Sequence, residues 1–308
     1  RHAAARGDRR RMLRVAVVGP GAIGSVVAVT LAQHPGLEVT VCARRPLSSL
    51  TVETPTRRLH VQPRVLTQPA EATPVDWVLV ATKAYDAAGA GEWIRRLAAQ
   101  GAPIAVLQNG VEHRERFAPY APAAQIVPVI VDLPAERAAD GSVRQRGRGL
   151  MTVAADDHGR AFAQFFGGSE IEVVCSPDLH TAAWRKLCLN SAGVISALLL
   201  QPAGVMRDEA IRAAAAEIVR ECIAVGRAEG ARLDDAIVDT VLDGYARAPV
   251  DAVNSLHADC AAGRPAEIDA RNGVIVRLGR KHGIPTPCNQ LAVALLEAQR
   301  APRVPTTT

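Results

Sequence analysis

Short runs of aliphatic and β-branched residues alternate with helical stretches in the first half of the chain. These runs are residues 13–18, 37–42, 77–82, 104–107 and 126–131. Such alternation is typical of a parallel sheet with helices on both faces. Two further runs, residues 149–154 and 171–175, are expected to extend the same sheet. The segment DGSVRQRGRG, just before them, is interpreted as a hairpin or surface turn rather than a site.

The pattern changes after Ser176 and Pro177. Residues 178–300 are rich in Ala, Leu, Arg and Glu, and helical periodicity continues between Gly and Pro breaks. The sequence therefore predicts an α/β protein. Its N-terminal domain, residues 12–177, is expected to be Rossmann-type and doubly wound, and residues 178–300 to form an all-helical domain.

The two ends of the chain lack a folding pattern. Residues 1–11 show no apolar periodicity and are expected to be a disordered leader, whereas residues 301–308 contain two prolines and are expected to fray. Five arginines and one aspartate give the leader a net charge of +4, out of +5 for the whole chain. The remainder is nearly neutral, which argues against a nucleic-acid partner.

Other classes of function are excluded by composition. The six cysteines are scattered, no secretory segment is visible, and the histidines lack the spacing of metal ligands. No apolar run approaches the roughly 20 residues that cross a bilayer. We therefore expect a cytoplasmic protein without a metal site and without a membrane partner.

A glycine-rich turn joins the first predicted strand to the first predicted helix. Its residues are Gly19, Pro20, Gly21, Ala22, Ile23 and Gly24. In such a motif the first glycine makes a tight turn, the second admits a pyrophosphate, and the third allows close packing of helix and strand. The phosphate then lies on the N-terminus of the helix. This context favours a dinucleotide site over an ordinary glycine turn.

The end of the second predicted strand favours NADP(H). A protein that binds NAD usually offers Asp or Glu to the ribose about 20 residues downstream. This chain reads VTVCARRP there, with Arg44 and Arg45. A carboxylate repels a 2′-phosphate, whereas a guanidinium binds it through two hydrogen bonds. Two solvated surface arginines are the alternative interpretation.

Two further predicted strands end in polar residues. The strand predicted within WVLVATKAYD ends with Lys83, and the strand predicted within PIAVLQNGVE ends with Gln108, Asn109 and Gly110. Ligands of α/β proteins bind at the carboxyl ends of strands. We expect Lys83 to contact phosphate or ribose, and Asn109 to contact the nicotinamide and the substrate. Each residue alone fits an ordinary turn equally well.

Polar residues of the second domain are candidates for catalysis. Lys186 and Asn190 are four residues apart and share one face of an otherwise apolar helix. A lysine in apolar surroundings loses its proton more easily, as the reduction of a ketone requires, but a lysine with its head in water fits the pattern as well. Ser255 and Glu267 carry no distinctive signal alone.

Together these segments resemble the ketopantoate reductases (2-dehydropantoate 2-reductases). The resemblance is carried by GPGAIG, VATKAYD, QNG, WRKLCLN and EIDARNGVIVRLGRKHGIPTPCN. It covers most of the chain from Met12 to about Asn289. It implies an NADPH-dependent reduction of a branched 2-keto acid, a small-molecule substrate, in pantothenate biosynthesis. It also implies that the helical domain is like that of 6-phosphogluconate dehydrogenase.

The resemblance assigns roles to individual residues. Lys186 matches the proton donor, and Glu267 matches an acid that contacts the cofactor or the lysine. Asn109, Asn190 and Ser255 match residues that bind substrate, and Asn109 also lies near the nicotinamide. Arg44 and Lys83 match contacts to NADP. The glycine-rich turn, residues 19–24, completes the expected cofactor site.

Two positions depart from the family pattern. A second asparagine is usual one turn after Asn190, where this chain has Val194, and another asparagine is replaced near Ala203. We therefore expect the substrate to be ketopantoate or a related, less polar 2-keto acid. A β-hydroxyacid-dehydrogenase-type oxidoreductase and a non-catalytic NADP(H)-sensing protein are the alternatives. The oligomeric state is open, with a homodimer as one option.

Overall fold

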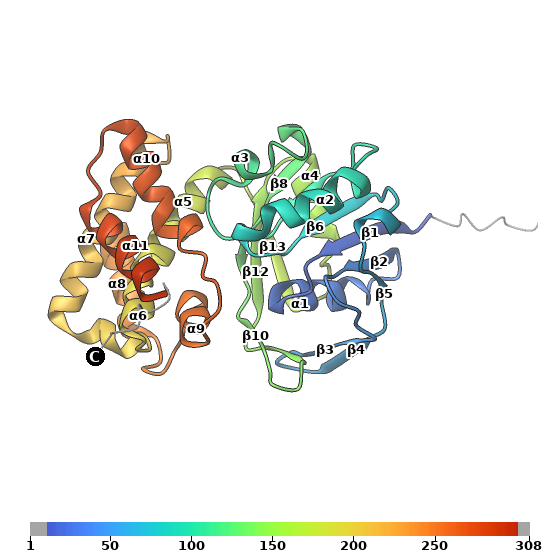
Figure 1. Cartoon of the computed structure of the whole chain (residues 1–308), viewed down its shortest axis with the longest axis horizontal. Coiled ribbons are helices and arrows are strands. Elements are labelled where there is room, and N and C mark those ends of the chain that lie inside the picture. The colour runs from blue at the N-terminus through green and yellow to red at the C-terminus, as the bar shows by residue number, and fades with distance from the viewer. Residues whose placement is uncertain (1–10, 301–308) are drawn as a thin grey trace, which may run out of the picture. The chain divides into compact units, whose positions relative to one another are not determined.

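The computed structural model describes residues 11–300 and divides into two compact units (Figure 1). The α/β unit contains residues 11–108 and 113–177, and the helical unit contains residues 109–112 and 178–300. The predicted frayed tail and all of the predicted leader except Arg11 lie outside the described residues. Arg11 itself donates to Asp76 Oδ1 at 3.0 Å.

A six-stranded parallel sheet forms the centre of the α/β unit. Its strand order is β5-β2-β1-β6-β7-β8. The strands are β1 (Leu13–Val18), β2 (Leu37–Cys42), β5 (Arg64–Leu66), β6 (Trp77–Val80), β7 (Ile104–Val106) and β8 (Ile126–Pro128). The order reverses direction beside β1, as in doubly wound sheets.

Side chains alternate between two apolar layers, one on each face of this sheet. Val15 and Val17 of β1 pack in the layer that contains α1 (Ala22–Leu31), whereas Ala16 and Val18 pack in the layer that contains α2 (Ala87–Leu97). Figure 1 shows these two helices on either side of the strands. Because successive side chains of a strand point to opposite faces, an unbroken apolar run requires both faces to be covered.

The prediction that residues 149–154 and 171–175 extend the main sheet was wrong. β12 (Gly149–Ala154) and β13 (Ile171–Ser176) form a separate three-stranded sheet with β9 (Ile130–Asp132). The single strand predicted over residues 126–131 is split at Val129 between the two sheets. Pro128 ends β8, and because proline has no N–H to donate, the hydrogen-bond ladder cannot continue through it unchanged.

A four-stranded sheet, of order β10-β11-β3-β4, was not predicted. The DGSVRQRGRG segment contributes β11, which pairs with β10 as a hairpin, so the hairpin interpretation is confirmed. Leu50, Val52 and Val143 of this sheet join the apolar layer around α1. The strands are β3 (Leu50–Glu53), β4 (Arg58–Val61), β10 (Ala135–Arg137) and β11 (Val143–Gln145).

The helical unit contains no strand among its described residues, as the sequence predicted. Its core is built around the fully buried Trp184 and extends through α5, α6 and α7. Gly193 separates α5 from α6. The helices are α5 (Leu179–Ala192), α6 (Val194–Leu199), α7 (Glu209–Ala228), α8 (Ala236–Arg247), α9 (Ser255–Ala261), α10 (Val274–His282) and α11 (Pro287–Arg300).

The predicted fold class, a doubly wound α/β domain followed by an all-helical domain, is therefore confirmed. The α/β unit has two more helices, α3 (His113–Phe117) and α4 (Asp157–Gln164). Within residues 11–300, every helix is too short or too polar to cross a lipid bilayer.

Candidate active site

The glycine-rich turn of the α/β unit has the backbone that the sequence motif requires. Gly19 has φ +91°, a conformation that side chains rarely adopt. A Cβ on Gly19 would lie 2.7 Å from Thr82 Cγ2, and one on Gly24 would lie 2.1 Å from the Gly19 carbonyl oxygen. The first and third glycines are thus fixed by the protein's own packing.

Gly21 differs, because a Cβ there would meet no protein atom within 4 Å. Gly21 is also the N-cap of α1, and it offers no side-chain cap to the first N–H groups of the helix. An open approach to helix donors is what a pyrophosphate needs. This observation fits a dinucleotide at α1 better than an ordinary turn.

A guanidinium from the β10–β11 hairpin supports the turn. Arg137 Nη2 donates to the Pro20 carbonyl oxygen at 2.5 Å and lies 3.5 Å from Ser25 Oγ, while its Nη1 donates to the Gly141 carbonyl oxygen at 2.8 Å. Ser25 Oγ also donates to the Pro20 carbonyl oxygen, at 3.2 Å. The hairpin and α1 therefore hold the turn from two directions. Sequence reasoning treated this hairpin only as surface structure.

The ends of β6 and β7 are tied together at the carboxyl edge of the sheet. Gln108 Nε2 donates to Thr82 Oγ1 at 3.0 Å and to the Lys83 carbonyl oxygen at 3.3 Å. His113 Nε2 lies 2.9 Å from the Gln108 carbonyl oxygen, and burial lowers the pKa of this imidazole. A neutral His113 can donate from Nε2 and fix the β7 end. Lys83 is thereby placed beside Thr82, which abuts the glycine turn.

Arg44 follows β2 and is the exposed cation that the NADP(H) prediction needs. Its side chain is 89% exposed, and Nη1 lies 3.9 Å from Asp86 Oδ2. Asp86 belongs to the turn that begins directly after Lys83. Arg44 and Lys83 are thus brought toward one region of the α/β unit. An exposed pair at this distance contributes little stability, so Arg44 is available to a ligand phosphate.

Asn109 belongs to the helical unit, although Gln108, the residue before it, belongs to the α/β unit and β7 ends only three residues earlier at Val106. Gly110 has φ +106°, and a Cβ there would lie 2.8 Å from the Ala270 carbonyl oxygen. Glu112, at the end of this segment, pairs with Arg277 at 2.5 Å. The segment of residues 109–112 is therefore fastened to the helical unit at several points.

Three of the predicted site residues form one hydrogen-bonded chain in the helical unit. Asn109 Nδ2 donates to Glu267 Oε2 at 3.1 Å, and Asn190 Nδ2 donates to Asn109 Oδ1 at 3.4 Å. Lys186 lies one helical turn before Asn190 on α5. Glu267 is only 7% exposed, so its carboxylate is held in a largely dehydrated place.

Lys186 has unusual electrostatics. Burial, followed by the positive charge of Arg271, lowers the pKa of this lysine from its ordinary 10.5 to about 8. Lysines that act as acids or bases near neutral pH have pKa values depressed in this way. The interpretation of Lys186 as a lysine with its head in water fits this environment poorly.

Ser255 and the two departure positions lie elsewhere in the helical unit. Ser255 is the first residue of α9 and is exposed. Val194 is fully buried in the apolar core of the unit, and Ala203 is 5% exposed. Neither departure position offers a polar side chain to a substrate.

Sequence reasoning missed three residues near Gly193. A Cβ on this glycine would lie 2.7 Å from Tyr245 Oη, 3.0 Å from Asn254 Nδ2 and 3.2 Å from Arg271 Nη2. These donors come from different segments, so no local motif joins them. Arg271 alone had a signal, because a guanidinium interrupts an apolar helical pattern within EIDARNG.

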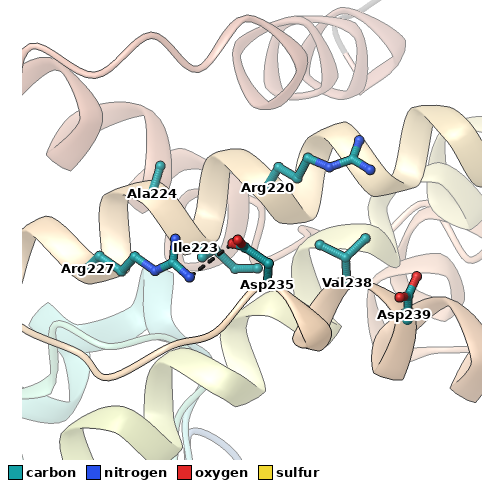
Figure 2. A pocket seen from close by; sticks show the side chains of 7 residues that line it. All are labelled: Arg220, Ile223, Ala224, Arg227, Asp235, Val238 and Asp239. Atoms are coloured by element: carbon teal, nitrogen blue, oxygen red, sulfur yellow. Dashed lines mark ion pairs between the residues drawn. The ribbon is translucent and has the colours of Figure 1, made fainter.

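A surface pocket of about 380 Å³ lies on α7 and α8, away from these residues. Figure 2 shows Arg227 of α7 pointing toward Asp235, with which it forms an ion pair of 2.9 Å. The pocket contains none of the predicted site residues. Within residues 11–300, no group of three or more His, Cys, Asp or Glu side chains could hold a metal ion.

Comparison with known proteins identifies relatives of both units. The family model described as "Ketopantoate reductase PanE/ApbA" matches residues 15–158. The model described as "Ketopantoate reductase PanE/ApbA C terminal" matches residues 178–300. The two matches cover most of the chain.

Individual 2-dehydropantoate 2-reductases are similar to this chain over nearly their full length. A 2-dehydropantoate 2-reductase of Caulobacter vibrioides is 50% identical over 287 residues, which cover 93% of this chain and 99% of the relative. A 2-dehydropantoate 2-reductase of Mycobacterium tuberculosis is 41% identical over 290 residues, which cover 92% of this chain and 97% of the relative. The crystal structure of a PanE/ApbA family ketopantoate reductase from Ralstonia eutropha is 32% identical, with a TM-score of 0.84 and coverage of 94% and 98%.

Proposed function

The chain belongs to the ketopantoate reductase PanE/ApbA family of oxidoreductases, which act on CH–OH groups, and we propose that it reduces a 2-keto acid with NADPH, with Lys186 as proton donor. The observation that carries this proposal is the position of Lys186 one helical turn before Asn190, whose amide is hydrogen-bonded through Asn109 to Glu267, in a place where burial lowers the pKa of the lysine to about 8. A surface lysine would have no reason to combine these features.

The α/β unit supplies the groups that would hold NADPH. The open N-terminus of α1 at Gly21 fits the pyrophosphate, and the exposed Arg44 fits the 2′-phosphate of the ribose. Lys83, at the end of β6, would contact phosphate or ribose. When bound, NADPH supplies the hydride that adds to the carbonyl carbon of the substrate.

Lys186 would complete the reduction at the carbonyl oxygen. Negative charge develops on this oxygen, and the Lys186 ammonium stabilises it and donates a proton to it. A pKa of about 8 leaves most of the lysine protonated at neutral pH, yet makes it a much stronger acid than an ordinary lysine. Glu267 would help to orient the Lys186 side chain and to stabilise its positive charge.

The amides would position the substrate. Asn109 and Asn190 hydrogen-bond to each other, which fixes which of their polar atoms remain for a ligand. Ser255, at the start of α9, would be a third substrate contact. Because Val194 and Ala203 are apolar and buried, the substrate is ketopantoate or a less polar 2-keto acid.

The deciding experiment measures NADPH oxidation by absorbance with ketopantoate and with less polar 2-keto acids of the same chain length. We expect turnover with at least one of them and a lower kcat/KM with NADH. A preparation that binds NADPH but oxidises it with none of these acids would remove the proposal. Reduction of NADP⁺ with a panel of 3-hydroxy acids tests the β-hydroxyacid-dehydrogenase alternative.

The alternative of a non-catalytic NADP(H) sensor is separated by Lys186→Ala. An enzyme loses turnover on this change and keeps its cofactor affinity, whereas a sensor has no turnover in either form. A homodimer and a cytoplasmic location stay predictions, which sedimentation equilibrium and cell fractionation test.

A further inference from the structure

Arg271 is a buried cation in the helical unit for which the sequence reading gave no role. It lies in a short π-helical segment, Asp269–Gly273, four residues after Glu267, and only 2% of its surface is exposed. Nε of its guanidinium is buried without a hydrogen-bond partner. Among residues 11–300 it forms no ion pair. Burying a charge in this way costs stability.

Among residues 11–300, the hydrogen bond of this guanidinium goes to the helix that carries Lys186. Arg271 Nη2 donates to the Asn190 carbonyl oxygen at 2.6 Å. Asn190 lies in the last turn of α5, where helix carbonyls have no partner within the helix. A cation at this end of a helix also interacts favourably with the helix dipole.

Four backbone carbonyls in and just after the last turn of α5 accept hydrogen bonds from side chains of other segments. The bonds are Tyr245 Oη to the Leu189 carbonyl (3.1 Å), Arg271 Nη2 to that of Asn190 (2.6 Å), Asn272 Nδ2 to that of Ser191 (3.1 Å) and Asn254 Nδ2 to that of Gly193 (3.0 Å). Three of the four donors are neutral. Arg271 is the charged one, and it holds the residue that is itself a predicted substrate contact.

The charged surroundings of Arg271 come from several elements. Tyr245 of α8, Asp259 and Cys260 of α9 and the carboxylate of Glu267 face it, and Lys186 of α5 is the cation near it. Both carboxylates also have other partners: Asp259 pairs with Arg264 at 3.0 Å, and Glu267 accepts from Asn109 at 3.1 Å.

We infer, on the basis of the proposed function, that Arg271 is a positioning residue for the reduction. It holds the Asn190 carbonyl in the last turn of α5 and so brings a positive charge to within about one helical turn of Lys186. The direction of the Lys186 pKa agrees, since burial is the larger cause of its lowering and Arg271 the second.

Two substitutions separate the two parts of this role. Arg271→Gln keeps an amide donor for the Asn190 carbonyl but removes the charge, and Arg271→Met removes both. Arg220→Gln is the matched control, because Arg220 is an exposed arginine of the same unit whose ion pair is with Glu217, on the surface. For each protein, kcat/KM for 2-keto acid reduction is measured from pH 6 to pH 10.

We expect the alkaline limb of the profile to move up by roughly one pH unit in Arg271→Gln and in Arg271→Met, because a nearby like charge lowers a lysine pKa by about that much. Arg271→Met should also lower the plateau by roughly tenfold. Arg220→Gln should leave both unchanged. A limb that stays in place in both Arg271 variants overturns the inference. The inference is also overturned if the Arg271 variants raise the KM for the 2-keto acid but not the KM for the corresponding 2-keto amide. That result would make Arg271 a contact to the substrate carboxylate.

A second measurement does not depend on turnover. The rate at which acetic anhydride modifies Lys186, followed by mass spectrometry against pH, reports its pKa directly. An upward shift in Arg271→Gln supports the inference even if no 2-keto acid is a substrate, and an unchanged profile in a folded variant overturns it. If the original protein shows no activity but the labelling profile still shifts upward in Arg271→Gln, the result contradicts the proposed function and leaves the inference about Arg271 in place.

Discussion

Asn109 and Glu267 stand 158 positions apart in the sequence, yet Asn109 Nδ2 donates a hydrogen bond to Glu267 Oε2 at 3.1 Å. One residue follows a strand of the α/β unit, and the other precedes the π-helical segment. Both belong to the helical unit. The bond therefore joins the segment of residues 109–112 to the part of that unit that carries the candidate acid.

Asn109→Asp should be harmful because it puts a second carboxylate against Glu267. We expect kcat/KM to fall at least tenfold and the free energy of unfolding to fall by roughly 1–3 kcal/mol. Adding Glu267→Gln should recover part of the stability, because the glutamine amide can donate to the new aspartate. Thermal unfolding of the single and double variants measures this coupling. Additive effects would show that the two side chains do not interact.

The three glycines of the turn should respond differently to alanine. Gly24→Ala places a Cβ 2.1 Å from a backbone oxygen, so we expect a lower melting temperature. Gly21→Ala meets no protein atom within 4 Å and should fold normally, but its methyl group would occupy the approach to α1. Calorimetric titration should show at least tenfold weaker NADPH binding in Gly21→Ala. Normal binding by Gly21→Ala would place the pyrophosphate elsewhere.

Lys186→Met should trade activity for stability. Loss of the proton donor is expected to reduce kcat by roughly 10²–10⁴-fold, with NADPH affinity unchanged. Burial in the folded protein lowers the pKa of Lys186 from 10.5 to about 8. At neutral pH the folded protein therefore holds a charged ammonium group that is better solvated by water in the unfolded chain. The methionine variant should therefore be about 2 kcal/mol more stable below pH 8. Chemical denaturation at pH 7 measures the difference.

The same lysine sets the expected pH dependence. Reduction needs the ammonium form, so kcat/KM should fall as pH rises through about 8. Oxidation of the hydroxy acid needs the neutral amine and should rise over the same range. Since the folded protein binds fewer protons at Lys186 than the unfolded chain between pH 8 and 10.5, this residue destabilises the fold fully below pH 8 and not above 10.5. The test is to measure kcat/KM against pH for reduction and for oxidation. The fall of one and the rise of the other should have the same midpoint, near pH 8.

Arg44→Ser should change cofactor preference and leave folding intact. The side chain is 89% exposed and its nearest carboxylate oxygen is 3.9 Å away, so little stability depends on it. We expect KM for NADPH to rise roughly tenfold or more and KM for NADH to stay unchanged. Arg45→Ser, the adjacent exposed arginine, is the control. Equal effects of the two substitutions on NADPH would point to general surface charge instead of a specific phosphate contact.

The sequence was most informative where local pattern and fold agree. Apolar runs identified the central strands, and loss of strand signals after Pro177 identified the helical unit. It was misleading at Val129, because the run from Ile126 to Val131 looks continuous while Pro128 moves the chain into another sheet. The four-stranded sheet was missed because its strands are short and two of them lie far from the other two.

The candidate site was predictable only in part for a similar reason. Lys186 and Asn190 share a helix, so their spacing alone brings them together. Gly193, by contrast, is surrounded by Tyr245, Asn254 and Arg271, which come from separate segments. Such tertiary neighbours leave no periodic trace in one sequence.

The assignment of residues 109–112 to the helical unit has a consequence for how this protein can change over generations. A recombination that exchanged everything after residue 177 for the corresponding part of a distant relative would look like a clean swap of whole modules. It would nevertheless pair the old Asn109, Gly110 and Glu112 with a foreign partner surface. The helical unit is thus encoded by two separate stretches of sequence. We expect residues 109–112 to covary with residues 267–277 rather than with their own sequence neighbours.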